Sequence, residues 1–348
     1  MSYDLKKRKR YLKKAVKPVE IDAGVSVSEL VRRMGDTAFQ GKNVSRAVDI
    51  WEEMLRGRTT VFFGLAGALV PAGMRELVTH LIKRRFIDCL VSTGANLFHD
   101  IHETLGRNHW QGSAHADDSD LRDAGIDRIY DVFAVEDEFN RADRYLYEFA
   151  LRLERRPYTT REFFFLLGKD LALKGRRDGI VRAAYRAGIP VYCPAIGDSS
   201  IGISLAMKDW EDNFLFDVIG DVKETAHLAS RAKNSGVVFA GGGTPKNFIQ
   251  QTEVTASIMC KRAPGHRYAV QITADAPHWG GLSGCTFEEA QSWGKIAKKS
   301  SRVTVNCDAT IALPVIVSAL TQRMQGFKRV LPDLSLKDAQ RVKKRIWE

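Results

Sequence analysis

The chain has 348 residues, of which 44% are hydrophobic and 27% charged, a composition typical of a globular protein with a large core. The longest apolar stretch, residues 61–74, is too short to cross a bilayer and contains three glycines and a proline, so we expect no membrane span. The N-terminus lacks the apolar run of a signal peptide, which favours a cytoplasmic protein.

The net charge of +11 is concentrated at the N-terminus. Residues 1–18 hold eight Lys and Arg residues against one Asp, which leaves only +4 on the rest of the chain. Such a run is more often a solvated arm than a nucleic-acid-binding segment, so we do not expect nucleic acid as a partner. We interpret residues 1–18 as a basic flexible arm and residues 19–348 as a single domain.

Two amphipathic helices are predicted after the arm, over residues 26–35 and 44–55, because apolar residues recur there at helical spacing. From residue 59 onward, short β-rich runs alternate with helical stretches, and residues 136–162 look like a helical insertion. This alternation predicts an α/β fold, a Rossmann-like, doubly wound, mainly parallel sheet with an N-terminal helical extension. The expected strands are residues 59–63, 87–92, 128–135, 190–196, 214–219, 237–240, 268–272 and 303–307.

Turns built from small residues follow several of these strands, at the edge of a parallel sheet where ligands bind. Gly, Ala, Ser and Thr let a backbone approach a ligand and direct N–H groups at phosphate oxygens. The GxGxxG fingerprint is absent, and the three glycines 241–243 alone could form a plain tight turn. Together the turns predict a nucleotide site, in which Asp198 and Asp308 either cap the next helices or bind a ribose or amide group. The turns are residues 63–73, 92–100, 194–200, 240–247 and 306–309.

No metal centre is predicted. The five cysteines are widely separated and show no zinc-binding spacing, so we interpret them as reduced thiols. His99 and His102 have the i, i+3 spacing of ligands on a helix, but the HExxH pattern and a third ligand are missing.

Residues 279–295, with the sequence WGGLSGCTFEEAQSWGK, are the most informative segment. Thr286 and Glu289 form a capping box, which predicts a helix that carries Lys295 about two turns from its start. A lysine in such a position is ordinarily a solvated charge. Burial against Trp279 or Trp293 would instead lower its pKa and free the amine to form a Schiff base.

SWGKI at residues 292–296, preceded by a Gly-rich turn and EEA, resembles the signature of deoxyhypusine synthases. STGA, PAIGDSSIG, GGG followed by PKN, SGCTFEEAQSWGK and CDA occur in the family's order across most of the chain. Five ordered motifs are far more specific than any one of them. In this family the lysine of SWGK carries the covalent imine, and here that lysine is Lys295.

The resemblance implies an enzyme that uses NAD to oxidise spermidine at a secondary-amine carbon, releases 1,3-diaminopropane and passes the aminobutyl group through the lysine to an acceptor amine. It also implies a homotetramer with sites at dimer interfaces. NAD contacts are implied for Gly67, Thr93, Gly94, Ala95, Asp198, Gly242, Ser283, Asp308 and Ala309. Substrate contacts are implied for His99, Asn247, Gly280, Glu289 and Trp293.

The chain departs from the pattern of eukaryotic deoxyhypusine synthases at positions whose side chains contact the polyamine in that family. Phe98 and His99 stand where acidic residues are expected, and Asn247 stands where a histidine follows GGG. Ile203 and Leu282 replace two further aspartates, and the first glycine-rich loop offers Gly67 and Ala68 in place of Ser and Asn.

The variants TGANLFHD, GGGTPKNF and PHWGGLSG resemble the bacterial branch, some members of which make homospermidine from putrescine. A tunnel with fewer carboxylates should bind a less charged or shorter amine, because an unpaired buried ammonium is costly. We therefore favour a small polyamine as acceptor. Modification of a protein lysine, an NAD-dependent amine dehydrogenase without transfer, and a binding protein that uses the arm remain alternatives.

Overall fold

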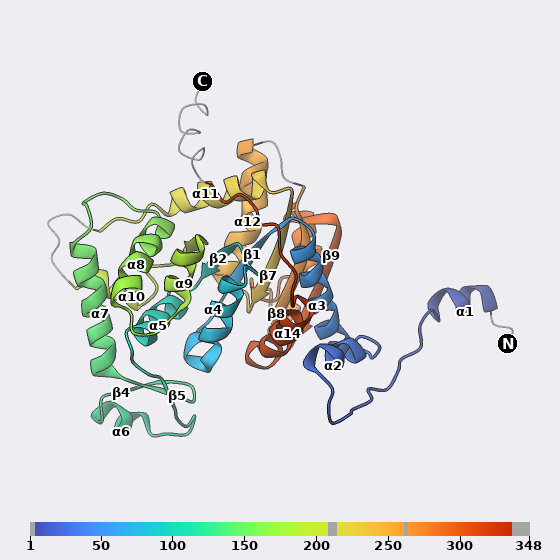
Figure 1. Ribbon diagram of the computed structural model, residues 1–348, viewed down its shortest axis with the longest axis horizontal. Coiled ribbons are helices and arrows are strands. Elements are labelled where there is room, and N and C mark those ends of the chain that lie inside the picture. Colours follow the sequence, from blue (N-terminus) through green and yellow to red (C-terminus); the bar gives the residue numbers. More distant parts are fainter. Residues whose placement is uncertain (1–3, 208–213, 261–263, 336–348) are drawn as a thin grey trace.

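The computed structural model describes residues 4–207, 214–260 and 264–335. Its centre is a six-stranded parallel sheet in the order β6-β2-β1-β7-β8-β9, which confirms the predicted doubly wound fold (Figure 1). Counted along the chain, this is the Rossmann order 3-2-1-4-5-6. The strands are β1 (Thr59–Leu65), β2 (Cys89–Ser92), β6 (Val191–Tyr192), β7 (Asn234–Ala240), β8 (His266–Thr273) and β9 (Ile296–Asn306).

Both faces of the sheet are covered by helices, because successive residues of the central strands point to opposite faces. Val61, Phe63 and Leu65 of β1 belong to the larger core cluster, whereas Phe62 belongs to a second cluster. The larger cluster contains residues of α2 (Val27–Met34), α3 (Phe39–Arg56), α4 (Arg75–Lys83), α5 (Gly94–Thr104), α7 (Glu136–Leu151), α8 (Thr160–Lys174), α9 (Ile180–Ala187), α10 (Ser200–Ala206) and α14 (Ala309–Arg323). The second contains residues of α11 (Val218–Arg231), α12 (Gly243–Cys260) and α13 (Phe287–Ser292).

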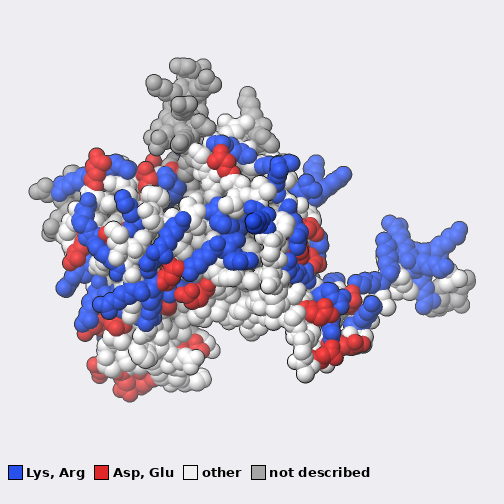
Figure 2. Space-filling view, viewed as in Figure 1, with Lys and Arg blue, Asp and Glu red and all other residues white. Residues whose placement is uncertain are grey.

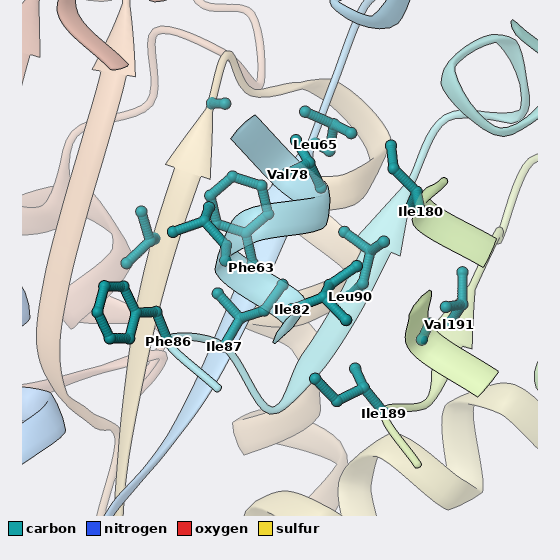
Figure 3. Packing of buried hydrophobic residues seen from close by; sticks show 14 of the residues in the cluster. Phe63, Leu65, Val78, Ile82, Phe86, Ile87, Leu90, Ile180, Ile189 and Val191 are labelled. Atoms are coloured by element: carbon teal, nitrogen blue, oxygen red, sulfur yellow. The ribbon is translucent and has the colours of Figure 1, made fainter. Parts of the chain in front are cut away.

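Large apolar side chains fill the space between the sheet and α4. Figure 3 shows Phe63 and Leu90 of two neighbouring strands beside Val78 and Ile82 of α4. All four are fully buried. The core thus fixes the central strands and their carboxyl ends.

Two of the expected strands are wrong. Residues 128–135 form most of an antiparallel hairpin, β4 (Ile126–Ile129) and β5 (Val132–Val135), in a separate small sheet with β3 (Trp110–Gln111). Tyr130 adopts a left-handed conformation (φ 56°) and turns the chain back. This hairpin and α6 (Asp118–Asp123) form the lobe at the bottom of Figure 1.

Residues 214–219 are not a strand either, because only Phe216 makes a bridge, to Tyr158, before α11 begins. Phe214 stacks on Tyr158 with ring centroids 5.8 Å apart, and Asp217 caps α11. The alternating aromatic residues therefore serve packing rather than sheet pairing. The expected strand 190–196 is reduced to its two residues Val191–Tyr192.

The basic arm includes a short helix, α1 (Leu5–Tyr11), which Asp4 caps and which buries no residue. It lies away from the body of the molecule in Figure 1, and Figure 2 shows it almost entirely covered by Lys and Arg. Its flexibility, and the division of the chain at residue 18, remain predictions. Within the described residues, no helix is both long and apolar enough to cross a membrane.

Candidate active site

Lys295 lies in the turn between α13 and β9, and not on a helix as the sequence analysis expected. Thr286 caps α13, with its Oγ1 accepting from the Glu289 N–H at 3.1 Å, which is the first half of the predicted capping box; the return bond from the Glu289 side chain is not among the contacts of the described residues. The helix ends at Ser292, because Gly294 adopts a left-handed conformation (φ 73°) that stops it. Lys295 is consequently turned into the protein and is only 9% exposed.

The Lys295 amine meets two of the predicted substrate residues. Nζ donates to Asn247 Oδ1 at 3.4 Å, and it lies 5.4 Å from the centroid of the Trp293 ring. Trp293 itself is 66% exposed, so the amine lies beneath an aromatic side chain at the surface. Trp279, the other tryptophan considered for burying the amine, is 75% exposed and packs on His278 instead.

A buried polar cluster holds the backbone beside Lys295. The His266 N–H donates to Lys295 O at 3.0 Å. The His266 ring contacts Ser235 Oγ at 2.9 Å, and Ser235 donates to Glu253 at 2.7 Å. Because these side chains are buried, the cluster fixes the turn that carries the lysine.

Lys246 is a second buried amine at this site, and the sequence analysis did not single it out. Its Nζ donates to Gln271 Oε1 at 2.9 Å, to Ser283 O at 3.3 Å and to Cys285 O at 2.5 Å. Burial lowers the pKa of the Lys246 amine to about 8. The lysine of GGGTPKN was its only signal, and nothing in the pattern distinguishes it from a solvated residue.

The other predicted substrate residues divide into two groups. Glu289 and Gly280 lie at the surface, and Glu289 lies close enough to Cys285 to raise the pKa of that thiol, although burial raises it more. His99 is buried on α5, where it contacts His109 and Phe139. Those contacts place it in a different cluster from Lys295 within this chain.

The positions that depart from the eukaryotic pattern also differ in exposure. Phe98 is buried against Phe139, whereas Ile203 and Leu282 are 62% and 50% exposed. Ile203 and Leu282 therefore offer apolar surface where acidic residues were expected.

The predicted NAD residues line the carboxyl ends of β1, β2, β6, β7, β8 and β9. The direction of chain winding reverses between β1 and β7, which pair side by side with Leu65 opposite Ala240. Ligands of doubly wound sheets bind at this reversal. The turns after these strands carry Gly67 and the three glycines 241–243.

Hydrogen bonds hold the first of these turns in place. Thr93 Oγ1 donates to Gly67 O at 2.7 Å. Asn96, which is fully buried, donates to the same oxygen at 3.0 Å and accepts from the Val70 N–H at 3.0 Å. Asn96 is a site residue that the sequence analysis missed, although it lies inside one of the small-residue turns that were recognised.

The glycines of the crevice serve two different purposes. Gly67 (φ 64°) and Gly243 (φ 54°) face open space, where a ligand could approach the backbone. In contrast, a Cβ at Gly94 would collide with Ser199, and one at Gly242 would collide with Ser283. Gly94 and Gly242 are therefore required by packing within the chain.

Two aspartates and two alanines complete the predicted set. Asp308 caps α14, accepting from the Thr310 N–H at 2.7 Å, as the structural alternative predicted. Asp308 and Asp198 are both exposed at the carboxyl edge, and Ala95 and Ala309 are half-buried there. The open backbone at Gly67 and the exposed carboxylates of Asp198 and Asp308 fit a dinucleotide, whereas the Gly243 N–H already donates to Ser283 Oγ at 3.0 Å.

No group of His, Cys, Asp and Glu within the described ranges could hold a metal ion.

Comparison with known proteins assigns the family. The family model described as deoxyhypusine synthase matches residues 29–320. The chain belongs to the deoxyhypusine synthase family. It is 52% identical to a probable deoxyhypusine synthase 2 of Methanosarcina mazei over 313 residues, covering 89% of this chain and 91% of the relative.

Two further relatives span archaea and bacteria. A probable deoxyhypusine synthase 2 of Archaeoglobus fulgidus is 51% identical over 82% of this chain and 95% of its own length. A deoxyhypusine synthase-like protein of Chlorobaculum parvum is 37% identical over 88% of this chain and 89% of its own. The predicted family is thus confirmed, and the branch that includes homospermidine synthases remains a prediction.

Solved structures confirm the fold. A crystal structure described as a deoxyhypusine synthase from Entamoeba histolytica superposes with a TM-score of 0.61 at 19% identity, covering 90% of this chain and 99% of that one. Membership of the deoxyhypusine synthase family makes the chain an enzyme of the transferase class.

Proposed function

We propose that this protein transfers a 4-aminobutyl group from spermidine or putrescine to an acceptor amine, with Lys295 as the imine-forming carrier. The supporting observation is the Lys295 amine, which is buried beneath Trp293 and bonded to the neutral Asn247 amide. Among the described residues it has no carboxylate partner that would hold it as a fixed ammonium. Without such a partner, Nζ is placed to act as the nucleophile that forms a Schiff base.

The cofactor in this proposal is NAD, whose nicotinamide would accept the hydride from the donor amine and return it to the product. Gly67, Asp198 and Asp308 would hold it at the reversal between β1 and β7. Thr93 would keep its hydrogen bond to Gly67 O and so fix the turn. The contacts predicted for Gly94, Ala95, Gly242, Ser283 and Ala309 are part of the same proposal.

For the acceptor we propose a small polyamine, so that the product is homospermidine. The chain lacks several of the side chains with which the family contacts a long polyamine. The positions concerned are Phe98, Ile203, Asn247 and Leu282. Glu289 remains as an exposed carboxylate beside Cys285, with Gly280 and His99 as further proposed substrate contacts. A site with few carboxylates favours an amine with few charges, because each unpaired ammonium loses solvation.

A protein lysine is the second candidate acceptor, and the names of the archaeal relatives at 51–52% identity favour it. We also propose a cytoplasmic homotetramer with sites at dimer interfaces. Large apolar side chains exposed at the carboxyl edge support an interface there, since they would otherwise face water. They are Ile203, Trp279, Leu282 and Ile311.

Mass spectrometry after borohydride reduction tests the proposal. The protein is incubated with NAD and either spermidine or putrescine, and an aminobutyl adduct on Lys295 is expected. Lys295→Arg should lose the adduct, whereas Lys298→Arg, a change at an exposed lysine of β9, should retain it. Adding putrescine or the lysine-bearing protein as acceptor then identifies the product.

Two results would contradict the proposal. No adduct with any amine would remove Lys295 as carrier. Amine-dependent NADH formation that survives in Lys295→Arg, without any adduct in the unmodified protein, would identify a dehydrogenase without transfer.

A further inference from the structure

Three histidines form a buried cluster between α5 and α7. His99 and His102 lie on α5, His109 lies on the segment that follows, and all three rings pack on Phe139 of α7. His99 is 8% exposed and His102 is fully buried. The mechanism described so far uses only His99, as a substrate contact.

Hydrogen bonds connect two of these histidines to a carboxylate in one line. Glu103 Oε1 accepts from His109 Nδ1 at 2.8 Å, and His109 Nε2 lies 2.9 Å from His99 Nδ1. Arg75 approaches the other oxygen of Glu103 at 3.6 Å. His102 stands outside the line, because its Nε2 donates to Asn108 O at 3.4 Å.

The Glu103 carboxylate fixes the position of one proton in the line. Glu103 only accepts, so the proton between them lies on His109 Nδ1. In the tautomer of His109 that has no second proton, Nε2 is an acceptor. His99 Nδ1 must then donate to it, which leaves a lone pair on His99 Nε2. Burial lowers the pKa of His99 to about 3, so the ring is neutral at physiological pH.

The far nitrogen of His99 is the open end of the line. Nε2 has no hydrogen-bond partner among the described residues, and it is not one of the unpartnered atoms that are shielded from solvent. His99 also occupies the position where the family resemblance places an acidic substrate contact. α5, which carries it, begins at Gly94, directly after the crevice turn at Thr93.

We propose that His99, His109 and Glu103 form a proton relay that takes a proton from the substrate amine, with His99 Nε2 as the atom that meets the substrate. This inference rests on the proposed function. In this relay His99 is the catalytic residue. His109 and Glu103 are positioning residues: they orient the His99 ring and accept the proton that it passes on.

The proton is accounted for at each step. The N–H bond of the substrate ammonium breaks and its proton binds His99 Nε2 in the same step in which the proton on His99 Nδ1 moves to His109 Nε2. The buried His99 ring therefore stays neutral, and the positive charge lies on His109, where the Glu103 carboxylate stabilises it. The freed electron pair on the substrate nitrogen is then available to form a C=N bond, and NAD, when bound, would supply the acceptor for the hydride of the adjacent carbon. Reversal of these steps returns the proton when the product amine is formed.

Kinetics with a matched control test the relay. His99→Gln, His109→Gln and Glu103→Gln should each lower kcat for amine-dependent NADH formation by roughly 10²-fold or more, because general-base catalysis contributes that much. Their KM for NAD should change little. His102→Gln alters a histidine of the same cluster on the same phenylalanine, yet it should keep kcat within about threefold. Equal losses in all four variants would overturn the relay and indicate a packing role.

A second measurement does not depend on activity or on variants. ¹⁵N NMR of the histidine rings in the unmodified protein should show His99 with a protonated Nδ1 and a lone pair on Nε2 at neutral pH. A proton on His99 Nε2 would overturn the relay.

The relay and the proposed function fail in different ways. 4-Aminobutanal can form the Lys295 imine without any amine oxidation, so His99→Gln should still give the borohydride-trapped adduct from this aldehyde. Loss of aldehyde trapping in the unmodified protein contradicts Lys295 as carrier. Normal amine oxidation in His99→Gln contradicts the relay alone.

Discussion

At the scale of single residues, the site contains two buried lysines that differ in how many hydrogen bonds their amines donate. Lys246 donates to three oxygens and so joins α12 to β8 and to the loop before α13. Lys295 donates to one amide oxygen at 3.4 Å. Lys246 is therefore fully engaged in holding the loop, and Lys295 is the amine with capacity for chemistry.

Substitution of Lys246 should have a stability effect that depends on pH. The pKa of about 8 lies below the ordinary 10.5, so between these values the unfolded chain binds more protons than the folded chain. The stability of the unmodified protein should therefore gain a contribution as the pH rises from 8 to 10.5. Lys246→Met should lack this contribution and lose about 2 kcal/mol at pH 7, because Gln271 Oε1 and Cys285 O lose this donor.

Urea unfolding at pH 7.5 and 9.5 measures the difference. Lys298→Met, at an exposed site, is the control and should follow the unmodified protein. An identical pH dependence in Lys246→Met and the control would show that Lys246 is not the group that titrates.

Leu282 offers a gain-of-function test of amine selection. Leu282→Asp adds a carboxylate at an exposed position next to Ser283, where an ammonium could pair with it. An exposed ion pair contributes about 0–1 kcal/mol, so KM for spermidine should fall by up to about fivefold. Leu282→Asn has a similar shape without the charge, and steady-state kinetics should show no such fall. Similar KM values for both variants would exclude a charge effect.

At the scale of elements, the sequence predicts a helix or strand where one pattern dominates, and it fails where a single residue redirects the chain. The capping pattern correctly predicts that the helix before Lys295 begins after Thr286. Gly294 ends this helix earlier than the apolar spacing suggests. Tyr130 makes a left-handed turn without glycine, so the hairpin at residues 126–135 looked like one strand. Asp217 was read as part of a strand although it caps α11.

Packing of α5 against the turn before α10 can be tested at Gly94. A methyl group there would collide with the Ser199 side chain, whose Oγ donates to Ile196 O at 2.7 Å. Gly94→Ala should cost about 1–3 kcal/mol in the free energy of unfolding. Adding Ser199→Gly removes the colliding atoms, so the double variant should be more stable than the sum of the two single changes predicts.

Thermal or urea unfolding of the four proteins completes this cycle. Strictly additive effects would mean that the two positions do not meet as the structure shows.

At the scale of the whole molecule, the sequence predicted the doubly wound sheet and the crevice at its carboxyl edge. Small-residue turns after apolar strands were sufficient for that, because the topology brings such turns together. The sequence could not predict that His109 joins His99 or that Lys246 reaches Cys285 O, because both contacts depend on side-chain packing across separate elements. Nor could the sequence show at which crevice glycines a serine side chain already occupies the space beside the Cα atom.

Removal of residues 1–18 should leave stability and amine transfer nearly unchanged. α1 buries no residue, and in the rest of the arm Lys14 and Lys17 form ion pairs with Asp36. Exposed ion pairs of this kind contribute about 0–1 kcal/mol. Melting temperature and adduct formation, compared with the full chain, measure the effect, and a loss of activity with an unchanged melting temperature would assign the arm a direct role.

The central pairing of β1 with β7 also shapes how the protein is made. Thr59 pairs with Asn234, so the reversal that would hold the cofactor cannot form until most of the chain has left the ribosome. Until then the β1 edge, with its fully buried run Thr59–Leu65, is open to other chains. Non-local parallel pairing is slow because loop closure precedes the gain in contacts. We therefore expect slow refolding from denaturant, with aggregation competing at high protein concentration, and NAD binding restored only in the last kinetic phase.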